Sequence, residues 1–234
     1  MRIEDQTGRN TNSSYGRVFN NNALGLLISK IQATVISNGS ELERMILSQT
    51  NNIADLEKFI AGIETDDGTY SDGIYVCPKK ILKKSKYAVH GCEPDLLVFA
   101  VQKRRICNVI ELKDGDAFDT KKSEVEKDHL EHFTQKFGTK IPFTTQYYVC
   151  CFNQDDKEQI KIGFKNKLSE EHMLTGRELC DLLKIGYEKI VRTRQADAES
   201  NLRYFLEELV KIEGVREKLI KSLRKQNREP TSPI

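Results

Sequence analysis

This 234-residue chain contains no tryptophan, and it lacks the sequence motifs of several common protein classes. The eight tyrosines form no stacking array. No Gly-x-x-x-x-Gly-Lys occurs, so nucleotide hydrolysis of the P-loop kind has no support in the sequence. No Cys-x-x-Cys pair occurs among the six cysteines, which argues against a structural zinc site.

Long apolar runs and a strong net charge are also missing. No apolar run, Leu24–Ile28 included, is long enough to span a bilayer, so we expect no membrane association. The first residues, MRIEDQTGRNTNSS, contain no apolar segment of the secretory type, so we expect a cytoplasmic protein. The net charge of +2 does not by itself indicate a nucleic-acid partner.

The composition that is present describes a soluble globular protein. Hydrophobic residues make up 38% of the chain and charged residues 31%, and the length allows one well-buried core. We therefore expect a single domain over residues 1–234. Cys107, Cys150 and Cys151 lie within apolar runs, which indicates small buried thiols in a reducing compartment and not disulfides.

Helices are predicted at the start of the chain. Leu24, Leu27 and Ile31 share one face of a helix over residues 22–36, which we expect Asn38-Gly39 to end. Ser40 and Glu43 have the spacing of a capping box, which predicts that a second helix begins there. A third helix carries an apolar face through residues 53–63, and residues 6–22 form a polar arm or loop.

Strands are predicted in the middle of the chain and helices after them. The strand-like runs are Ile74–Cys77, Asp95–Val101, Arg105–Lys113, Thr144–Phe152 and Gln159–Phe164. Further helices are expected at Thr120–Phe137, at Thr175–Leu183 and from Ala196 onward with a break at Gly214. This order predicts an α/β fold with a central mixed sheet of about five strands flanked by helices. We divide it into N-terminal helices (1–64), a core (72–183), a C-terminal helical region (184–229) and a tail (230–234).

The two strand-like runs around Lys103 bring three charged residues together. If they form an antiparallel hairpin centred near Lys103, the numbers of facing residues sum to about 206, so Asp95 faces Glu111. Facing side chains lie on the same side of the sheet, with Cβ atoms about 5 Å apart. Lys113 is two residues from Glu111, so the alternation of a strand places it on that side as well.

Two neighbouring carboxylates repel unless a cation lies between them. Mg²⁺ accepts one or two protein carboxylates together with waters and substrate phosphate, and it activates a bound water for phosphodiester hydrolysis. Lys113 would then orient that water or offset charge on the phosphate. The alternative is a salt-bridge cluster at the end of a sheet, because patterns this short recur by chance.

Longer motifs resemble a known family. The segments EPD (Glu93–Asp95) and ELK (Glu111–Lys113) resemble the PD-(D/E)xK nucleases. The segments at Glu111–Glu124 and Gly163–Leu183 are similar to type II restriction endonucleases. The resemblance implies that Asp95 and Glu111 bind Mg²⁺ with the backbone carbonyl of Leu112, and that Lys113 assists the attacking water. Many members add an acid from an earlier helix, for which Glu43 is the candidate, but the capping box explains Glu43 better.

The resemblance implies a bacterial enzyme that cuts duplex DNA at a short sequence and leaves a 5′-phosphate. It also implies a homodimer on a palindromic site and a cognate DNA methyltransferase in the same cell. One alternative is a repair or junction-resolving nuclease that selects DNA shape. Another, of a different class, is a non-catalytic DNA-binding protein.

Contacts to DNA are predicted from basic and polar residues. Phosphate contacts are expected from lysines before the hairpin and at the start of the following helix: Lys79, Lys80, Lys83, Lys84, Lys121 and Lys122. For base contacts we predict a segment between two elements that contains Arg192, Arg194 and Gln195, whose side chains match guanine and adenine edges. The polar arm at residues 6–22 is the second candidate. A solvated surface or helix cap is the alternative for each.

Overall fold

The computed structural model describes residues 1–8, 14–66, 68–115 and 120–226, apart from the side chains of 120–123 and 226. The chain divides into two compact units, and each is described by itself. The helical unit comprises residues 1–41 and 191–234, and the sheet unit comprises residues 42–190. In the described part of the chain, no helix combines the length and the apolar character needed to cross a membrane.

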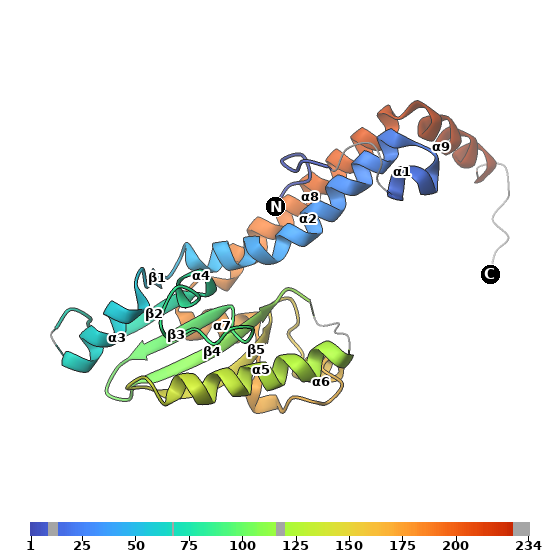
Figure 1. Cartoon of the computed structure of the whole chain (residues 1–234). Coiled ribbons are helices and arrows are strands. Elements are labelled where there is room, and N and C mark those ends of the chain that lie inside the picture. Colours follow the sequence, from blue (N-terminus) through green and yellow to red (C-terminus); the bar gives the residue numbers. More distant parts are fainter. Residues whose placement is uncertain (9–13, 67, 116–119, 227–234) are drawn as a thin grey trace. The chain divides into compact units, whose positions relative to one another are not determined.

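The sheet unit is built on one mixed sheet with the strand order β1-β2-β3-β4-β5-β6 (Figure 1). Its strands are β1 (Asn51–Asn52), β2 (Gly73–Pro78), β3 (Leu96–Val101), β4 (Ile106–Lys113), β5 (Thr144–Cys151) and β6 (Met173–Thr175). Strand β3 is antiparallel to both of its neighbours, β2 and β4. Strand β1 is parallel to β2, and β4, β5 and β6 are mutually parallel. The predicted α/β fold with a mixed sheet is confirmed.

The prediction of a strand at Gln159–Phe164 is wrong. The segment is the helix α6 (Lys157–Gly163), and the side chain of Asp156 caps it by accepting a hydrogen bond from the Glu158 N–H at 2.9 Å. Ile160 is buried but Ile162 is 54% exposed, so the alternation of apolar residues did not mark a buried strand face. The two edge strands of the sheet are β1 and β6, which are too short to produce a recognisable alternation of apolar residues in the sequence.

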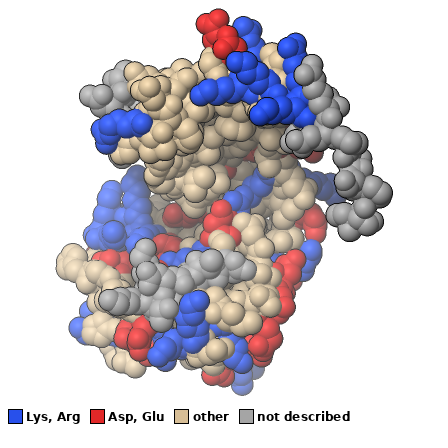
Figure 2. All heavy atoms as spheres, turned by 90° about the vertical axis from the view of Figure 1, so that its right-hand side faces the viewer, with Lys and Arg blue, Asp and Glu red and all other residues tan. Residues whose placement is uncertain are grey.

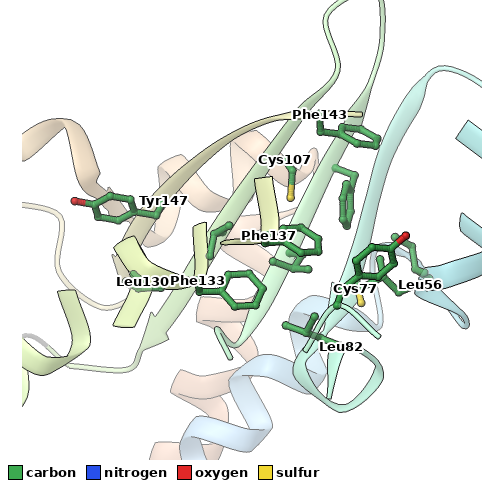
Figure 3. Close-up of a cluster of buried hydrophobic side chains, with 14 of the residues drawn as sticks. Leu56, Cys77, Leu82, Cys107, Leu130, Phe133, Phe137, Phe143 and Tyr147 are labelled. Atoms are coloured by element: carbon green, nitrogen blue, oxygen red, sulfur yellow. The ribbon is translucent and has the colours of Figure 1, made fainter. Parts of the chain in front are cut away.

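Side chains alternate between the two faces of the sheet, and each face has its own core. On one face, aromatic residues from α3 (Leu56–Thr65), α5 (Thr120–Gly138) and the strands pack together (Figure 3). The rings of Phe133 and Phe137 on α5 lie 5.1 Å apart and point into this cluster beside Cys107. Burying each such ring contributes about 1.5–3 kcal/mol.

The opposite face is covered by three helical segments. Leu42 and Ile46 near the end of α2 (Asn22–Leu47), α7 (Gly176–Leu183) and Ile190 in α8 (Tyr187–Lys211) pack against the even-numbered residues of the strands. The helix α7 begins with a true capping box, in which Thr175 Oγ1 accepts from the Glu178 N–H and Glu178 Oε2 accepts from the Thr175 N–H. The short elements α4 (Lys79–Leu82) and the 3-10 turn η1 (Glu170–His172) complete the unit.

The expected helix end at Asn38-Gly39 and the helix start at Ser40 are both wrong. The helix α2 is continuous over 26 residues, so Ser40 and Glu43 lie inside it and form no capping box. A Cβ atom added at Gly39 would have no neighbour within 4 Å, which is consistent with an uncrowded helical position. Leu42 and Ile46, which follow this point in α2, are fully buried, and their packing outweighs the low helix propensity of Asn-Gly.

The helical unit contains α1 (Ser14–Phe19), most of α2, most of α8 and α9 (Glu213–Gln226). Lys30 Nζ on α2 donates a hydrogen bond to Tyr204 Oη on α8 at 3.0 Å. The expected helix start at Ala196 is wrong because α8 already begins at Tyr187, and the break falls at Ile212 and not at Gly214. Part of the predicted polar arm is helical (α1), and residues 9–13 lie outside the described residues.

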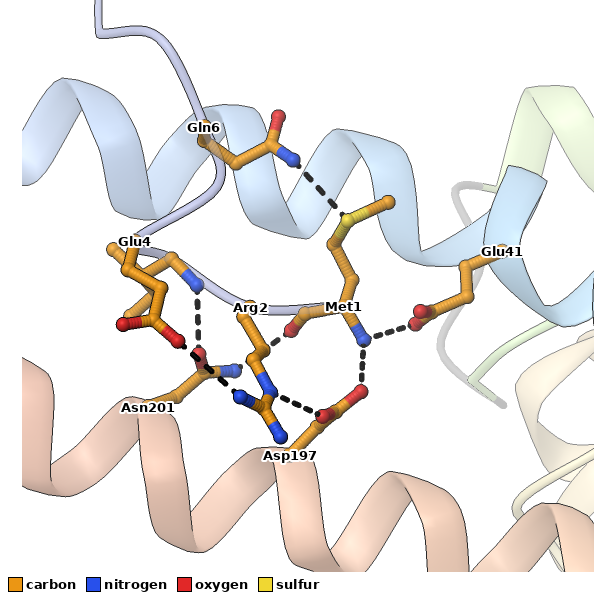
Figure 4. Close-up of polar contacts among 8 residues, drawn as sticks. Met1, Arg2, Glu4, Gln6, Glu41, Asp197 and Asn201 are labelled. Carbon is orange, nitrogen blue, oxygen red and sulfur yellow. Dashed lines mark hydrogen bonds and ion pairs between the residues drawn. The ribbon is translucent and has the colours of Figure 1, made fainter.

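The first residues of the chain join α2 to α8 within the helical unit (Figure 4). The Met1 ammonium pairs with the Glu41 carboxylate on α2 and lies 2.6 Å from Asp197 Oδ2 on α8. Arg2 Nε donates to Asp197 Oδ1 at 3.2 Å. Asn201 accepts from the Ile3 N–H at 2.7 Å and donates to the Met1 carbonyl at 2.9 Å, so polar contacts hold the two helices together.

All six cysteines belong to the described residues and are free thiols, as predicted. Five are buried, and only Cys92 is half-buried. Burial raises the pKa of Cys77 and of Cys180 to about 12, so these thiols remain protonated and behave as small apolar side chains.

Candidate active site

The hairpin of β3 and β4 has the predicted register. Leu96 faces Ile110 and Val98 faces Asn108, so the numbers of each facing pair sum to 206. Continued by one residue, this register sets Asp95 opposite Glu111, at the end of the hairpin away from the turn at residues 102–105. The hairpin forms because two β-branched, apolar runs flank a short polar turn.

Asp95, Glu111 and Lys113 share the face of the sheet that α5 covers, because odd-numbered residues of both strands point to it. Lys113 Nζ donates to Glu111 Oε1 at 2.8 Å and to Glu126 Oε1 at 2.5 Å. Glu126 lies on α5 and was not predicted as a site residue. Its other oxygen, Oε2, is buried and has no hydrogen-bond partner among the described residues.

The Asp95 carboxylate is held by two donors. Its Oδ2 accepts from the Leu112 N–H at 2.9 Å, and its Oδ1 is 3.1 Å from Lys79 Nζ. The structure thus brings Asp95, Glu111 and Lys113 together and adds Lys79, which the sequence had assigned to phosphate contact. The role of the Leu112 carbonyl stays a prediction.

Burial and like charge set the electrostatics of the site. Burial, followed by the nearby Asp95 carboxylate, raises the pKa of Glu111, and the two lysines only partly offset this. Burial works against the charged form of Lys113, but Glu111 and Glu126 outweigh it and raise the pKa of Lys113 to about 12. At neutral pH Lys113 is therefore an ammonium group that donates hydrogen bonds.

Glu43 also belongs to the surroundings of this site. Burial, and then the Asp95 carboxylate, raise the pKa of Glu43, whereas Lys79 lowers it. The side chain is half-buried on α2. The expected capping box of Ser40 and Glu43 does not form, because both residues lie inside α2, and this wrong helix boundary is why the sequence does not predict Glu43 at the site.

The donor set of the site fits a hard divalent cation. Within the described ranges, no three His, Cys, Asp or Glu side chains gather closely enough to form a metal site by themselves. Asp95 and Glu111 supply two carboxylates, the number that Mg²⁺ takes from proteins when waters and phosphate complete its shell. Burial and then the neighbouring Asp95 carboxylate disfavour the charged form of Glu111, and a bound cation would favour it.

The other predicted DNA contacts lie on two elements. Lys80 on α4 and Lys83 and Lys84 directly after it have exposed side chains. The side chains of Lys121 and Lys122 in the first turn of α5 lie outside the described residues.

The residues proposed for base contacts do not occupy a loop. Arg192, Arg194 and Gln195 lie inside α8, so their expected position between two elements is wrong. Arg192 and Gln195 are exposed, and Arg194 is half-buried. Helical spacing places Arg192 and Gln195 on one side of α8, and their contact with DNA stays a prediction.

Comparison with known proteins gives one informative relative. No protein-family model matches the chain, and no solved structure matches it. The chain is 52% identical over 224 residues to the type II restriction enzyme HhaII of Haemophilus parahaemolyticus. The aligned region covers 94% of this chain and 98% of that protein, so both units of the structure have counterparts in the relative.

Proposed function

This chain belongs to the type II restriction enzymes, and from that premise we propose that it hydrolyses duplex DNA at a short specific sequence with the help of Mg²⁺. The observation that carries the proposal is the β3–β4 register, which gathers Asp95, Glu111 and Lys113 on one face of the sheet. Such a face suits a PD-(D/E)xK nuclease. A repair nuclease and a non-catalytic DNA-binding protein are less consistent with the relative, which is named as a restriction enzyme.

In the proposed reaction Asp95, Glu111 and the carbonyl of Leu112 hold the metal ion. A bound Mg²⁺ polarises a phosphoryl oxygen and lowers the pKa of a water. We assign Glu43 an accessory part, because its carboxylate adds negative charge near Asp95.

Lys113 acts as a hydrogen-bond donor in this scheme and not as a base, because its ammonium group keeps its proton at neutral pH. Glu111 and Glu126 fix its Nζ by two short contacts. From there it orients the attacking water and offsets charge on the phosphate. Hydrolysis joins the water oxygen to phosphorus and breaks the bond between phosphorus and O3′. The water gives up a proton to the solvent and O3′ takes one up, which leaves a 5′-phosphate and a 3′-hydroxyl group.

A digest of DNA of known sequence, with and without Mg²⁺, tests this function. We expect discrete fragments with 5′-phosphates and common sequence at their ends, formed only with the metal. Lys113→Ala should abolish cleavage and keep DNA binding. The matched control is Lys103→Ala, which removes an exposed lysine from the turn of the same hairpin. Smears, nicks at DNA junctions or cleavage by Lys113→Ala would contradict the proposal.

We place the phosphate contacts on basic surface residues of each unit. In the sheet unit these are Lys80, Lys83 and Lys84. In the helical unit α9 has five exposed basic residues, and Lys and Arg are dense on the face of this unit that Figure 2 shows. These residues on α9 are Arg216, Lys218, Lys221, Arg224 and Lys225. Phosphate contacts release counterions, so DNA affinity should fall steeply with salt.

We also propose that the enzyme is a homodimer. Cutting both strands of a palindrome needs two sites, and the described residues contain one such constellation. Among them, all exposed large apolar side chains except Val125 and Ile162 belong to the helical unit. Leu202, Leu206 and Val210 repeat at every fourth residue of α8, which gives one apolar stripe for a second copy.

Sedimentation of the full chain tests this interface. We expect the wild type to be a dimer and Leu206→Glu to be a monomer, because the substitution places a charge in the stripe. Ile162→Glu, at an exposed apolar residue of the sheet unit, should remain dimeric. A dimer that survives Leu206→Glu would place the interface elsewhere.

A methyltransferase of the same specificity in the same bacterial cytoplasm would protect the host DNA.

A further inference from the structure

Lys79 is attached to Asp95 by two contacts. Its backbone N–H donates to the Asp95 carbonyl at 2.9 Å, and its Nζ lies 3.1 Å from Asp95 Oδ1. The first contact extends the ladder between β2 and β3, in which Pro78 faces Leu96. The sheet itself therefore fixes the position from which the Lys79 side chain reaches the carboxylate.

This contact distinguishes Lys79 from the lysines that follow it. The side chains of Lys80, Lys83 and Lys84 are exposed, whereas Lys79 and Asp95 keep only 35% and 23% of their side-chain surface accessible. Asp95 and Glu111 both attract the charge of Lys79, and Lys113 repels it. Lys79 thus belongs to the candidate active site and not to the exposed basic surface.

The two carboxylates of the site each have their own ammonium group. Lys79 pairs with Asp95, and Lys113 pairs with Glu111. An ammonium group on Asp95 Oδ1 occupies one of the oxygens that the proposed function gives to Mg²⁺. The two cations compete for that oxygen.

We propose that Lys79 is a placeholder cation that holds Asp95 in the metal-free enzyme, yields the carboxylate to the divalent ion, and then serves the scissile phosphate. This inference rests on the proposed function. Once Asp95 binds the metal, Lys79 loses its partner and is repelled by the added positive charge. Its flexible four-carbon chain lets the ammonium move, and the phosphate is the anion that enters the site with the substrate.

A purely structural role for Lys79 has a different signature. If Lys79 only kept Asp95 in place, its loss would weaken metal binding and slow cleavage together. A placeholder that competes with the metal and later assists the phosphate has opposite effects on the two quantities. Its loss should tighten metal binding while it slows cleavage.

The test compares Lys79→Met with Lys103→Met, which removes an exposed lysine from the turn between β3 and β4. Binding of Mg²⁺ alone to the full-length chain is measured by titration calorimetry without DNA. We expect Lys79→Met to bind Mg²⁺ at least about fivefold more tightly than the wild type, the effect of removing one charge at about 4 Å in water. At saturating Mg²⁺ its cleavage rate should fall about tenfold or more, and Lys103→Met should match the wild type in both assays.

Two further variants secure the interpretation. Lys79→Arg keeps the charge and should restore Mg²⁺ affinity and most of the cleavage rate. Lys79→Gln replaces Lys79→Met if the latter does not fold, and the same outcomes apply. Unchanged or weaker Mg²⁺ binding in both neutral variants would overturn the placeholder. Asp95→Asn is the reference for a chain without the metal site. If the wild type binds Mg²⁺ no better than Asp95→Asn and does not cut DNA, the proposed function itself is contradicted, and not only the role of Lys79.

Discussion

Two carboxylates in this molecule expose similar fractions of their side-chain surface, but Glu111 lies in the more strongly desolvated surroundings, and the pKa values of the two are shifted in opposite directions. Asp197 in the helical unit keeps 16% of its side-chain surface exposed, and Glu111 in the sheet unit keeps 17%. Burial opposes ionisation of both, yet hydrogen bonds from the Met1 ammonium and Arg2 lower the pKa of Asp197. The pKa of Glu111 is raised, because Asp95 adds to the effect of burial and Lys113 does not compensate for both.

The difference separates a charge that stabilises the fold from one that we propose serves a ligand. Asp197 receives two cationic donors and needs nothing more, so its ionised form stabilises the helical unit. Glu111 is buried beside Asp95, and its partner Lys113 is shared with Glu126, so its charged form is not fully compensated. Burial alone therefore does not mark a candidate functional acid, whereas burial next to a second carboxylate makes Glu111 such a candidate.

The largest expected effect is the loss of activity in Glu111→Gln. The substitution keeps the shape of the side chain and removes the charge that we assign to the metal, so cleavage should fall by at least about 10²- to 10³-fold. Rates are measured on mapped DNA at saturating Mg²⁺. Glu158→Gln, on the exposed surface of α6, is the control and should cut normally. Near-normal cleavage by Glu111→Gln would remove Glu111 from the site.

A smaller effect, on stability, is expected for Asp197→Asn. The change weakens two charge-assisted contacts, each worth about 1.5–3 kcal/mol when a charged group takes part, although exposure reduces this. We expect the free energy of unfolding of the helical unit to fall by about 1–2 kcal/mol. Urea denaturation followed by circular dichroism measures it. If stability is unchanged, the contacts in Figure 4 do not hold α2 and α8 together.

The pH dependence of stability should have opposite signs for the two residues. A raised folded pKa means that stability is lost as pH rises through it, so Glu111→Gln should match the wild type in acid and become the more stable protein above the raised pKa of Glu111. A lowered folded pKa means that stability is present above the ordinary value of 3.8 and is lost as pH falls below it. The deficit of Asp197→Asn should therefore persist from neutral pH down to about pH 4. Melting temperatures without Mg²⁺ between pH 4 and 8 check both trends. The same pH dependence of stability in both variants would contradict opposite pKa shifts for Glu111 and Asp197.

The smallest effect is expected for Gly39→Ala, which changes neither set of charges. Gly39 lies inside α2 and has room for a methyl group, so alanine should raise the free energy of unfolding by about 0.5–1 kcal/mol. Cleavage per folded molecule should be unaffected. A destabilised variant would mean that α2 does not continue through Asn38-Gly39 in solution.

The sequence predicts the β3–β4 hairpin well because local rules determine it. The alternation of apolar residues fixes which face is buried, and the short turn fixes which residues face each other. The meeting of Asp95, Glu111 and Lys113 follows from these two rules. The roles of the three residues in metal binding and hydrolysis stay predictions.

Contacts from other elements could not be predicted in this way. Glu126 reaches Lys113 from α5, and Lys79 reaches Asp95 from the end of β2, so both pairs depend on how helices and strands pack. Glu43 was missed because Asn38-Gly39 resembles a helix end when only local propensity is considered. The segment of α6 was mistaken for a strand because three apolar residues at every second position fit a strand as well as a short capped helix.

The pairing of β4 on both of its sides has a consequence for protein engineering. Parallel pairing with β5 from Ile106 to Lys113 holds β4 in place independently of the hairpin turn. Residues 102–104 of that turn are exposed and lie at the opposite end of the strands from Asp95. A fluorescent label or a few inserted residues could therefore be introduced there to report on DNA binding while the chemistry continues undisturbed.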